Sequence, residues 1–192
     1  MGVIFQSLGR TIAAGFALVV VLFLLFNGVP MGHQWGIFAA KWLHVLSGIL
    51  WIGLLYYFNF VQIPSMPKIP DEQKPAIGKV IAPTALFYFR WAALATVVTG
   101  VVVAAGSGYI MQALMFQRPF LAIGIGMWLA LIMAFNVWFI IWPNQKKALG
   151  IVTVEAAEKA KAARMAMLTS RANTMLSIPM LYMMVAQQNG GL

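Results

Sequence analysis

The sequence contains no cysteine, which excludes disulfide bonds and thiolate metal sites. Acidic residues are nearly absent as well, since four Asp and Glu stand against thirteen Lys and Arg. The four are Asp71, Glu72, Glu155 and Glu158, and none falls in an apolar segment. An ion-coupled transporter normally buries a carboxylate among its spanning helices. The sequence therefore disfavours ion-coupled transport, and it offers neither a carboxylate pair nor a Ser/His/Asp set for catalysis.

Charged residues of either sign make up 9% of the 192 residues, whereas hydrophobic residues make up 62%. Soluble domains carry about 25% charged residues, so this chain lacks the side chains that cover a water-facing globule. The composition predicts an all-α integral membrane protein, a bundle of about five transmembrane helices in a bacterial-type inner (plasma) membrane. The net charge of +9 then indicates loops that face the cytoplasm and anionic lipid heads, and no nucleic acid partner.

The apolar segments predict about five transmembrane helices within a single membrane domain over residues 1–192. The first four approach or exceed the ~20 residues that a bilayer crossing requires. Four prolines between Pro64 and Pro75 interrupt any regular helix there, which predicts a loop. The predicted spans are about 11–27, 35–60, 83–105, 119–142 and 166–187, and the predicted cytoplasmic loops are about 61–82 and 143–165.

The last predicted span differs from the others because its uninterrupted apolar part, Ile178–Ala186, is short and contains Pro179. Ser170, Asn173 and Ser177 recur at helical spacing and therefore lie on one narrow face. Polar groups within a membrane are costly unless they face the interior of a bundle. The sequence therefore predicts that this face turns inward.

Lysine and arginine fall mainly on one side of a five-span chain. Arg10 and the basic residues of segments 68–79 and 146–171 share one side, whereas Lys41 and Arg118 lie on the other. Cytoplasmic loops of membrane proteins carry an excess of Lys and Arg. This asymmetry predicts a multi-pass protein with its N-terminus in the cytoplasm and its C-terminus outside.

Two histidines, His33 and His44, are candidate metal ligands. They are eleven residues apart and would share one helix face at a separation of ~16 Å, so they cannot bracket the iron of one haem. We interpret His33 as a solvated loop residue. His44 lies about three turns inside the predicted membrane boundary, where an imidazole is costly unless it is paired or bound. Either His44 is an axial ligand of haem b, or it hydrogen-bonds to a neighbouring helix.

Gly48 and Arg90 complete the candidate cofactor site. Gly48 lies one turn after His44, so either the edge of a macrocycle or a neighbouring helix can pack against it. Arg90 lies about two turns inside the third predicted span. Its guanidinium either pairs with an anionic group, such as a haem propionate, or snorkels to the cytoplasmic interface. Methionine is another source of an axial ligand, but the sequence does not choose among thirteen.

Four stretches after residue 40 form a recognisable pattern. In chain order they are Trp42-Leu43-His44-Val45-x-x-Gly48-x-x-Trp51-Ile52-Gly53, Phe89-Arg90-Trp91, Asn136-Val137-Trp138 with Ile141-Trp142-Pro143, and Ser170-Arg171-Ala172-Asn173. Together they resemble the N-terminal membrane domain of the membrane-bound urate hydroxylase family, also called the urate oxidase N-terminal domain. None of the four stretches is a catalytic signature, and the resemblance is specific because all four occur in the same order.

The resemblance implies urate oxidation, with electrons passed to a C-terminal cytochrome c domain that carries a Cys-x-x-Cys-His haem site. This chain has no cysteine, so it resembles a standalone form without that domain. The family pattern also implies histidines where Ala172 and the segment Gln187–Asn189 stand here, which leaves His44 alone of that set.

Three functions remain open from the sequence. The first is a non-catalytic membrane subunit or scaffold of a larger respiratory or redox complex. It is suggested by small residues at every fourth position, namely Ala92, Thr96, Gly100 and Ala104. Small residues at this spacing let a helix of another subunit, or of a second copy in a homo-oligomer, pack closely against this one. The second is a b-type haem electron-transfer protein that uses His44 and a soluble cytochrome c. The third is a urate-oxidising enzyme with a separate cytochrome c. Membrane lipids are partners in all three, and the sequence leans against an enzyme.

Overall fold

A computed structural model describes residues 2–26 and 32–190, and every regular element in them is a helix. The chain divides into two compact units, residues 1–36 and 37–192. The elements are α1 (Gly2–Phe5), α2 (Leu8–Phe26), α3 (His33–Tyr56), η1 (Tyr57–Gln62), α4 (Ile63–Ser65), η2 (Met66–Lys68), α5 (Lys74–Ala76), η3 (Ile77–Ile81), α6 (Ala82–Gly106), α7 (Ile110–Leu114), α8 (Leu121–Phe135), η4 (Asn136–Ile141), α9 (Trp142–Ala148) and α10 (Ala156–Asn189).

The prediction of an all-α helical bundle is confirmed. Among the described residues, four helical stretches are long and apolar enough to cross a membrane. They are Leu8–Phe26, His33–Lys68, Lys74–Gly106 and Leu121–Ala148. Helix α10 has 34 residues but does not belong to this apolar set. A fifth crossing and a single domain therefore stay predictions.

The region predicted as a loop at about 61–82 is mostly helical. The preceding helix continues through the π-helical segment η1 to Lys68, and the next helix starts at Lys74. Proline fits the first two positions of a helical segment, where its missing N–H would have no partner in any case. Three prolines occupy such positions: Pro64, Pro67 and Pro75. They mark the starts of new turns, and this is why they do not produce a long loop.

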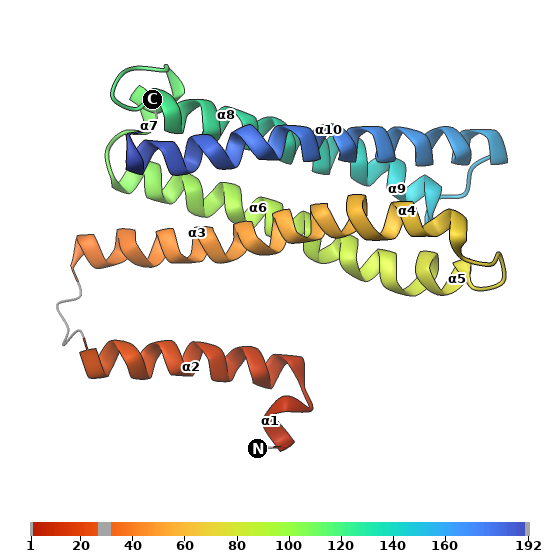
Figure 1. Cartoon of the computed structure of the whole chain (residues 1–192), viewed down its shortest axis with the longest axis horizontal. Helices are drawn as coiled ribbons and strands as arrows, with labels where there is room; N and C mark the ends of the chain where they lie inside the picture. The colour runs from red at the N-terminus through yellow and green to blue at the C-terminus, as the bar shows by residue number, and fades with distance from the viewer. Residues whose placement is uncertain (1, 27–31, 191–192) are drawn as a thin grey trace. The chain divides into compact units, whose positions relative to one another are not determined.

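Helices α3 and α6 run antiparallel in the second unit (Figure 1). At one end, a Cβ on Gly106 would lie 3.3 Å from Cγ1 of Ile37. At the other end, the rings of Phe58 and Phe89 are 5.7 Å apart between centroids. Trp51 is fully buried in the hydrophobic cluster that these helices share with α8, η4 and α10. The core therefore lies where α3, η1, α6, α8, η4 and α10 meet.

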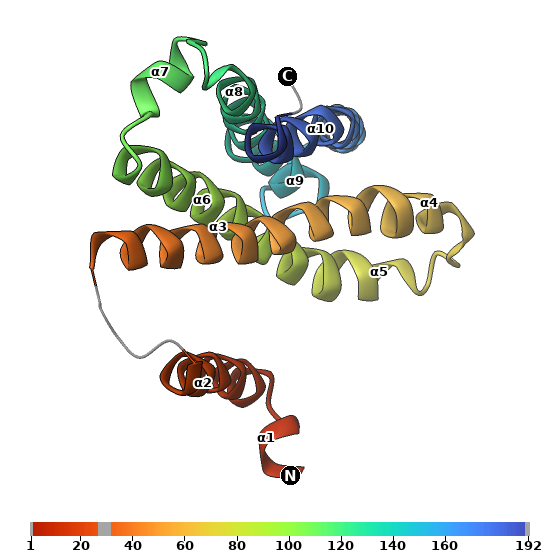
Figure 2. The same cartoon turned by 60° about the vertical axis from the view of Figure 1, so that its left-hand side comes forward.

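Helix α10 packs beside α8 (Figures 1 and 2), and the predicted inward turn of its polar face is confirmed. Ser170, Asn173 and Ser177 are 6%, 0% and 0% exposed. Asn173 donates through Nδ2 to the carbonyl oxygen of Met133 at 3.0 Å. Its Oδ1 accepts from Nδ2 of Asn136 at 2.8 Å. These interhelical bonds satisfy the buried amide and explain how a polar face is accommodated.

The two asparagines that reach α10 both lie in π-helical segments. Asn136 begins η4, and Asn59 lies in η1, where it donates to Oγ of Ser170 at 2.8 Å. One turn before Asn59, the hydroxyls of Tyr56 and Ser177 are 3.0 Å apart. A π-turn contains one extra residue and so changes which side chains face a neighbour. Both segments therefore supply partners for the polar face of α10.

Replacing Asn173 with alanine is expected to lower the free energy of unfolding by about 2 kcal/mol, because two interhelical hydrogen bonds are lost and the partly buried amide of Asn136 loses its partner. Thermal unfolding in detergent measures the change. The control is Asn189→Ala, since the exposed Asn189 side chain donates to the carbonyl of Val185 within its own helix, at 2.9 Å. Equal midpoints for the two variants would contradict the assignment.

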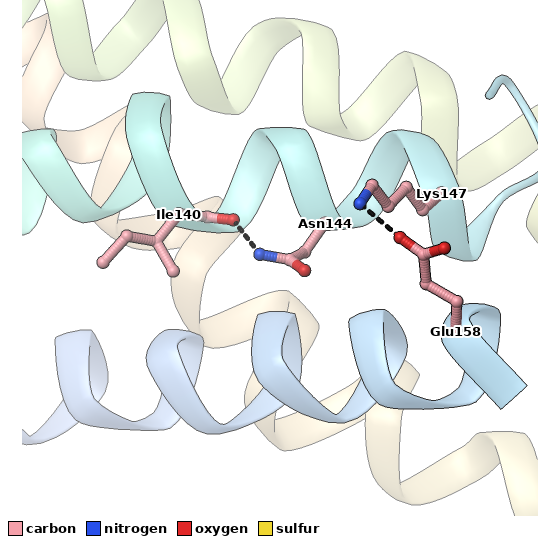
Figure 3. Close-up of polar contacts among 4 residues, drawn as sticks. All are labelled: Ile140, Asn144, Lys147 and Glu158. Atoms are coloured by element: carbon pink, nitrogen blue, oxygen red, sulfur yellow. Dashed lines mark hydrogen bonds and ion pairs between the residues drawn. The ribbon is translucent and has the colours of Figure 1, made fainter. Parts of the chain in front are cut away.

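An ion pair joins α9 to α10 (Figure 3). Nζ of Lys147 lies 2.5 Å from Oε1 of Glu158. One turn earlier, Asn144 donates to the carbonyl oxygen of Ile140 at 2.8 Å. Residues 149–155 between the two helices are the irregular part of the predicted 143–165 loop. Both ionic side chains are partly exposed, so the pair contributes at most about 1 kcal/mol and mainly orients the connection.

Candidate functional site

His44 lies on α3 with its imidazole ring against α6. Its Nδ1–H donates to the carbonyl oxygen of Thr96 at 2.8 Å, and Oγ1 of Thr99 lies 3.3 Å from the same nitrogen. A carbonyl oxygen can only accept, so the proton lies on Nδ1 and the lone pair of the neutral ring lies on Nε2. No hydrogen bond joins Nε2 to any residue in the described part of the chain. Metal-binding histidines are commonly oriented in this way, through the nitrogen that does not bind the metal.

Gly100 makes room for this ring. A Cβ at position 100 would lie 2.9 Å from Cε1 and 3.2 Å from Nδ1 of His44. Any larger residue would therefore displace the imidazole from the Thr96 carbonyl. Gly48 has a different role, because a Cβ there would meet Cγ2 of Thr96 at an ordinary contact distance of 3.9 Å. The sequence predicts Gly48 as part of the site. In the structure, Gly100 is the glycine that leaves space for the His44 ring.

A cavity of about 550 Å³ opens beside His44. Its volume lies within the range of small-molecule and cofactor sites. Its apolar walls with a few polar groups are also typical of such sites. Helices α3 and α6 form one side, and α7, α8 and α10 form the other. The lining residues are Lys41, His44, Val45, Thr96, Val97, Gly100, Val101, Val103, Tyr109, Ile110, Leu114, Phe120, Ile123, Met127, Ala130, Leu131, Met184, Val185, Gln187, Gln188 and Asn189.

Lys41 and Tyr109 bring polar groups to the cavity. Lys41 lies three residues before His44 and so occupies the same face of α3, one turn closer to the helix start. The ring of Tyr109 stacks on Phe120 with centroids 5.0 Å apart. Burial raises the pKa of Tyr109, so its hydroxyl stays protonated and neutral at physiological pH. These two residues therefore add a cationic group and a neutral hydroxyl to the cavity lining.

Gln187 lines the cavity and is hydrogen-bonded through its side chain. Its Oε1 accepts from the backbone N–H of Ile123 at 3.1 Å, and its Nε2 donates to the carbonyl oxygen of Pro119 at 3.1 Å. Both polar atoms of the side chain are thus engaged with the start of α8. The family resemblance implies a histidine near this position, and in this chain the glutamine ties α10 to α8.

Arg90 and His33 lie outside the cavity lining. The guanidinium carbon of Arg90 is 3.4 Å from the ring centre of Trp142. Arg90 precedes Gly100 by ten residues on α6, which places the two ~15 Å apart along the helix. His33 is the exposed first residue of α3. The structure brings His44 and Gly100 together, and it brings neither Arg90 nor His33 to them.

The wall opposite His44 was missed by sequence reasoning. Ile123, Met127, Ala130 and Leu131 line the cavity at spacings of four, three and one, which is one face of α8. This signal is present in the sequence, but α8 is apolar all round and the face does not stand out by polarity. The neighbours of this wall come from α7 and α10, and only the fold brings them together.

The described residues contain no group of three or more His, Asp or Glu side chains that could hold a metal ion. A bare ion at His44 would therefore lack a protein ligand set. One oriented imidazole in an apolar cavity instead suits a metal that is already held by its own macrocycle. Haem is such a group, and the cavity volume and the free Nε2 fit it.

Comparison with known proteins gave one finding. The family model described as urate oxidase N-terminal matches residues 91–190, which is more than half of the 192 residues. The match includes α8, α10 and most of α6, and it leaves out α3 with His44. No curated protein and no solved structure matches the chain significantly.

Proposed function

The chain belongs to the urate oxidase N-terminal family, and from this premise we propose that it is an integral membrane electron-transfer protein that binds a b-type haem through His44. One observation carries the proposal. The imidazole is fixed by the 2.8 Å bond from Nδ1 to the Thr96 carbonyl, which leaves Nε2 for a ligand, and His44 lines a cavity of about 550 Å³. An uncommitted imidazole within a spanning helix is costly, and a ligand bond offsets that cost.

The residues around the cavity have separate tasks in this proposal. His44 would hold the iron, and Gly100 leaves the ring free to stay on the Thr96 carbonyl. Lys41, one turn away on the same face, would pair with the acidic edge of the macrocycle. The apolar side chains of α6 and α8 exclude water from its faces. When bound, a b-type haem supplies reversible one-electron chemistry.

The proposed orientation suggests a partner. The cavity lies at the end of the bundle where α3 begins and α10 ends, which is the outer side if the N-terminus is cytoplasmic. We propose a soluble cytochrome c on that side as the electron partner, within a bacterial-type inner membrane. Helices of sufficient length and apolarity support the membrane location.

A non-catalytic membrane subunit is the competing proposal, and its main sequence argument is weaker in the folded chain. Ala92, Thr96 and Ala104 are 5%, 7% and 1% exposed, because they pack inside this chain. Gly100 lies against the His44 ring and leaves the space that this ring occupies. The small-residue face of α6 is therefore used internally and is not free for another subunit. Haem content separates the two proposals, since a scaffold does not require it.

Urate oxidation with a separate cytochrome c is a further proposal that rests on the family alone, and a fold does not fix a function. Membranes that contain the protein would be supplied with urate and oxidised cytochrome c. Reduction of the cytochrome that depends on urate and on the protein would support this activity. The absence of that reduction in a preparation with full haem content would leave electron transfer without urate chemistry.

His44→Ala is expected to reduce haem content to the background of membranes without the protein, because the only imidazole of the cavity is removed. Protein is expressed with a haem precursor, purified in detergent, and assayed as the pyridine haemochrome. His33→Ala is the matched control, since His33 lies outside the cavity lining, and it should keep the haem of the unmodified protein. Full haem in His44→Ala would refute the assignment, and no haem in the unmodified protein would refute the proposed function.

A further inference from the structure

We infer that Met127 supplies the second axial ligand of the metal that His44 holds, from the opposite wall of the same cavity. The inference rests on the proposed function and goes beyond it by naming the residue, the ligand atom and the coordination number. A ligand set of one histidine nitrogen and one methionine sulfur raises the reduction potential of a haem. The chain would then be a relatively oxidising electron carrier.

The first argument is the position of Met127 on α8. Residues Ile123, Met127 and Leu131 are spaced by four and all line the cavity, with Met127 in the middle. Long side chains in a helix point onto the face that they share with residues three and four positions away. Because Met127 lies on α8 and His44 on α3, a thioether from Met127 would reach a metal in the cavity from a different helix than His44 does.

The second argument is that three other polar residues of the lining are poorly placed to bind the metal or are already hydrogen-bonded. Lys41 lies on the same helix face as His44, so it cannot reach the opposite side of a metal that His44 binds. Gln187 uses both polar atoms on the backbone of α8 and its preceding turn. Oγ1 of Thr96 donates within its own helix, to the carbonyl of Ala92 at 2.7 Å. With these three set aside, the thioether sulfurs of Met127 and Met184 are the soft donors of the cavity lining, the kind that pairs with histidine on a haem iron.

The third argument distinguishes Met127 from Met184, the other methionine of the lining. A Cβ added to Gly126 would lie 3.3 Å from Cε and 3.4 Å from Cγ of Met184. The Met184 side chain is thus laid along the backbone of α8, and its sulfur lies between two carbons that are in that contact. Gly126 accommodates this packing, which gives Met184 a role in joining α10 to α8. Met127 instead lies in the middle of the α8 face that lines the cavity, between Ile123 and Leu131.

The test compares the unmodified protein with Met127→Leu, Met127→His and Met184→Leu, each reconstituted with haem. Leucine preserves volume and removes the sulfur, so Met127→Leu should convert a six-coordinate low-spin spectrum to a five-coordinate high-spin one. The reduced haem should then bind carbon monoxide, and the reduction potential should fall. Met127→His should restore the low-spin spectrum, since a histidine supplies a new ligand at that place. Met184→Leu should keep the spectrum and the potential of the unmodified protein.

The outcomes separate this inference from the proposed function. A protein without haem would overturn both. Haem that depends on His44 but shows the same spectrum and potential in Met127→Leu would overturn the inference alone. The inference alone would also be overturned if Met184→Leu, and not Met127→Leu, produced the high-spin form. A merely structural role of Met127 predicts lower haem content without rescue of the low-spin state by Met127→His.

Discussion

Gly124→Ala is expected to separate α7 from α8 and to lower the amount of folded protein recovered in detergent. A Cβ at position 124 would lie 2.1 Å from the carbonyl oxygen of Ala113 and 2.9 Å from its carbonyl carbon. Both are backbone atoms, so no side-chain rotation relieves the clash, and one helix must move. Overpacking of this kind costs about 3 kcal/mol. Because Ile110 and Leu114 of α7 line the cavity, the movement should also lower haem content.

The measurements are the thermal midpoint and the haem content of the same preparation. Gly36→Ala is the matched control, since a Cβ at position 36 on α3 meets nothing within 4 Å. Alanine has a higher helix propensity than glycine, so this control should be as stable as the unmodified protein or more so. A Gly124→Ala protein with an unchanged midpoint would show that α7 does not pack against α8 as described.

The fold was largely predictable because apolar runs of this length favour helices that can cross a membrane. Long apolar runs had to be helices, and the polar face with Ser170, Asn173 and Ser177 had to turn inward, as it does. The regions around the prolines could not be predicted in the same way. In the structure, Pro64 and Pro75 lie at the starts of helical segments. From the sequence alone, prolines at this spacing are equally compatible with a loop. Periodicity alone does not distinguish these two cases.

The candidate site was predictable only in part. His44 could be found because a titratable residue deep in an apolar segment is rare, and this argument needs no tertiary structure. Its partners could not be found in this way, because the Thr96 carbonyl is a backbone group and Gly100 acts through a missing side chain. Arg90 was equally conspicuous by its charge, yet it lies against Trp142. The rarity of polar residues in apolar segments identifies candidate site residues, but only the packing of the helices shows which residues lie next to them.

Gly100→Ala is expected to remove haem while the protein stays folded. The added methyl group would lie 2.9 Å from Cε1 and 3.2 Å from Nδ1 of His44, and the obstructed group is a side-chain ring that can rotate away. The helices therefore keep their positions, but the bond from Nδ1 to the Thr96 carbonyl is lost. Loss of such an orienting bond weakens metal binding by about 10- to 100-fold. Haem titration of purified protein measures this change.

Gly53→Ala is the control for this variant, since a Cβ at position 53 on α3 meets nothing within 4 Å. Its haem affinity and thermal midpoint should equal those of the unmodified protein or exceed them slightly. Gly100→Ala should match it in apo-protein midpoint and differ from it in haem affinity, and this contrast separates a displaced ligand from a damaged fold. If both variants bind haem equally, the ring does not depend on the space that Gly100 leaves, and His44 in this position is not the ligand. If Gly100→Ala loses stability as well, then α6 has moved, and the loss of haem would follow from the fold.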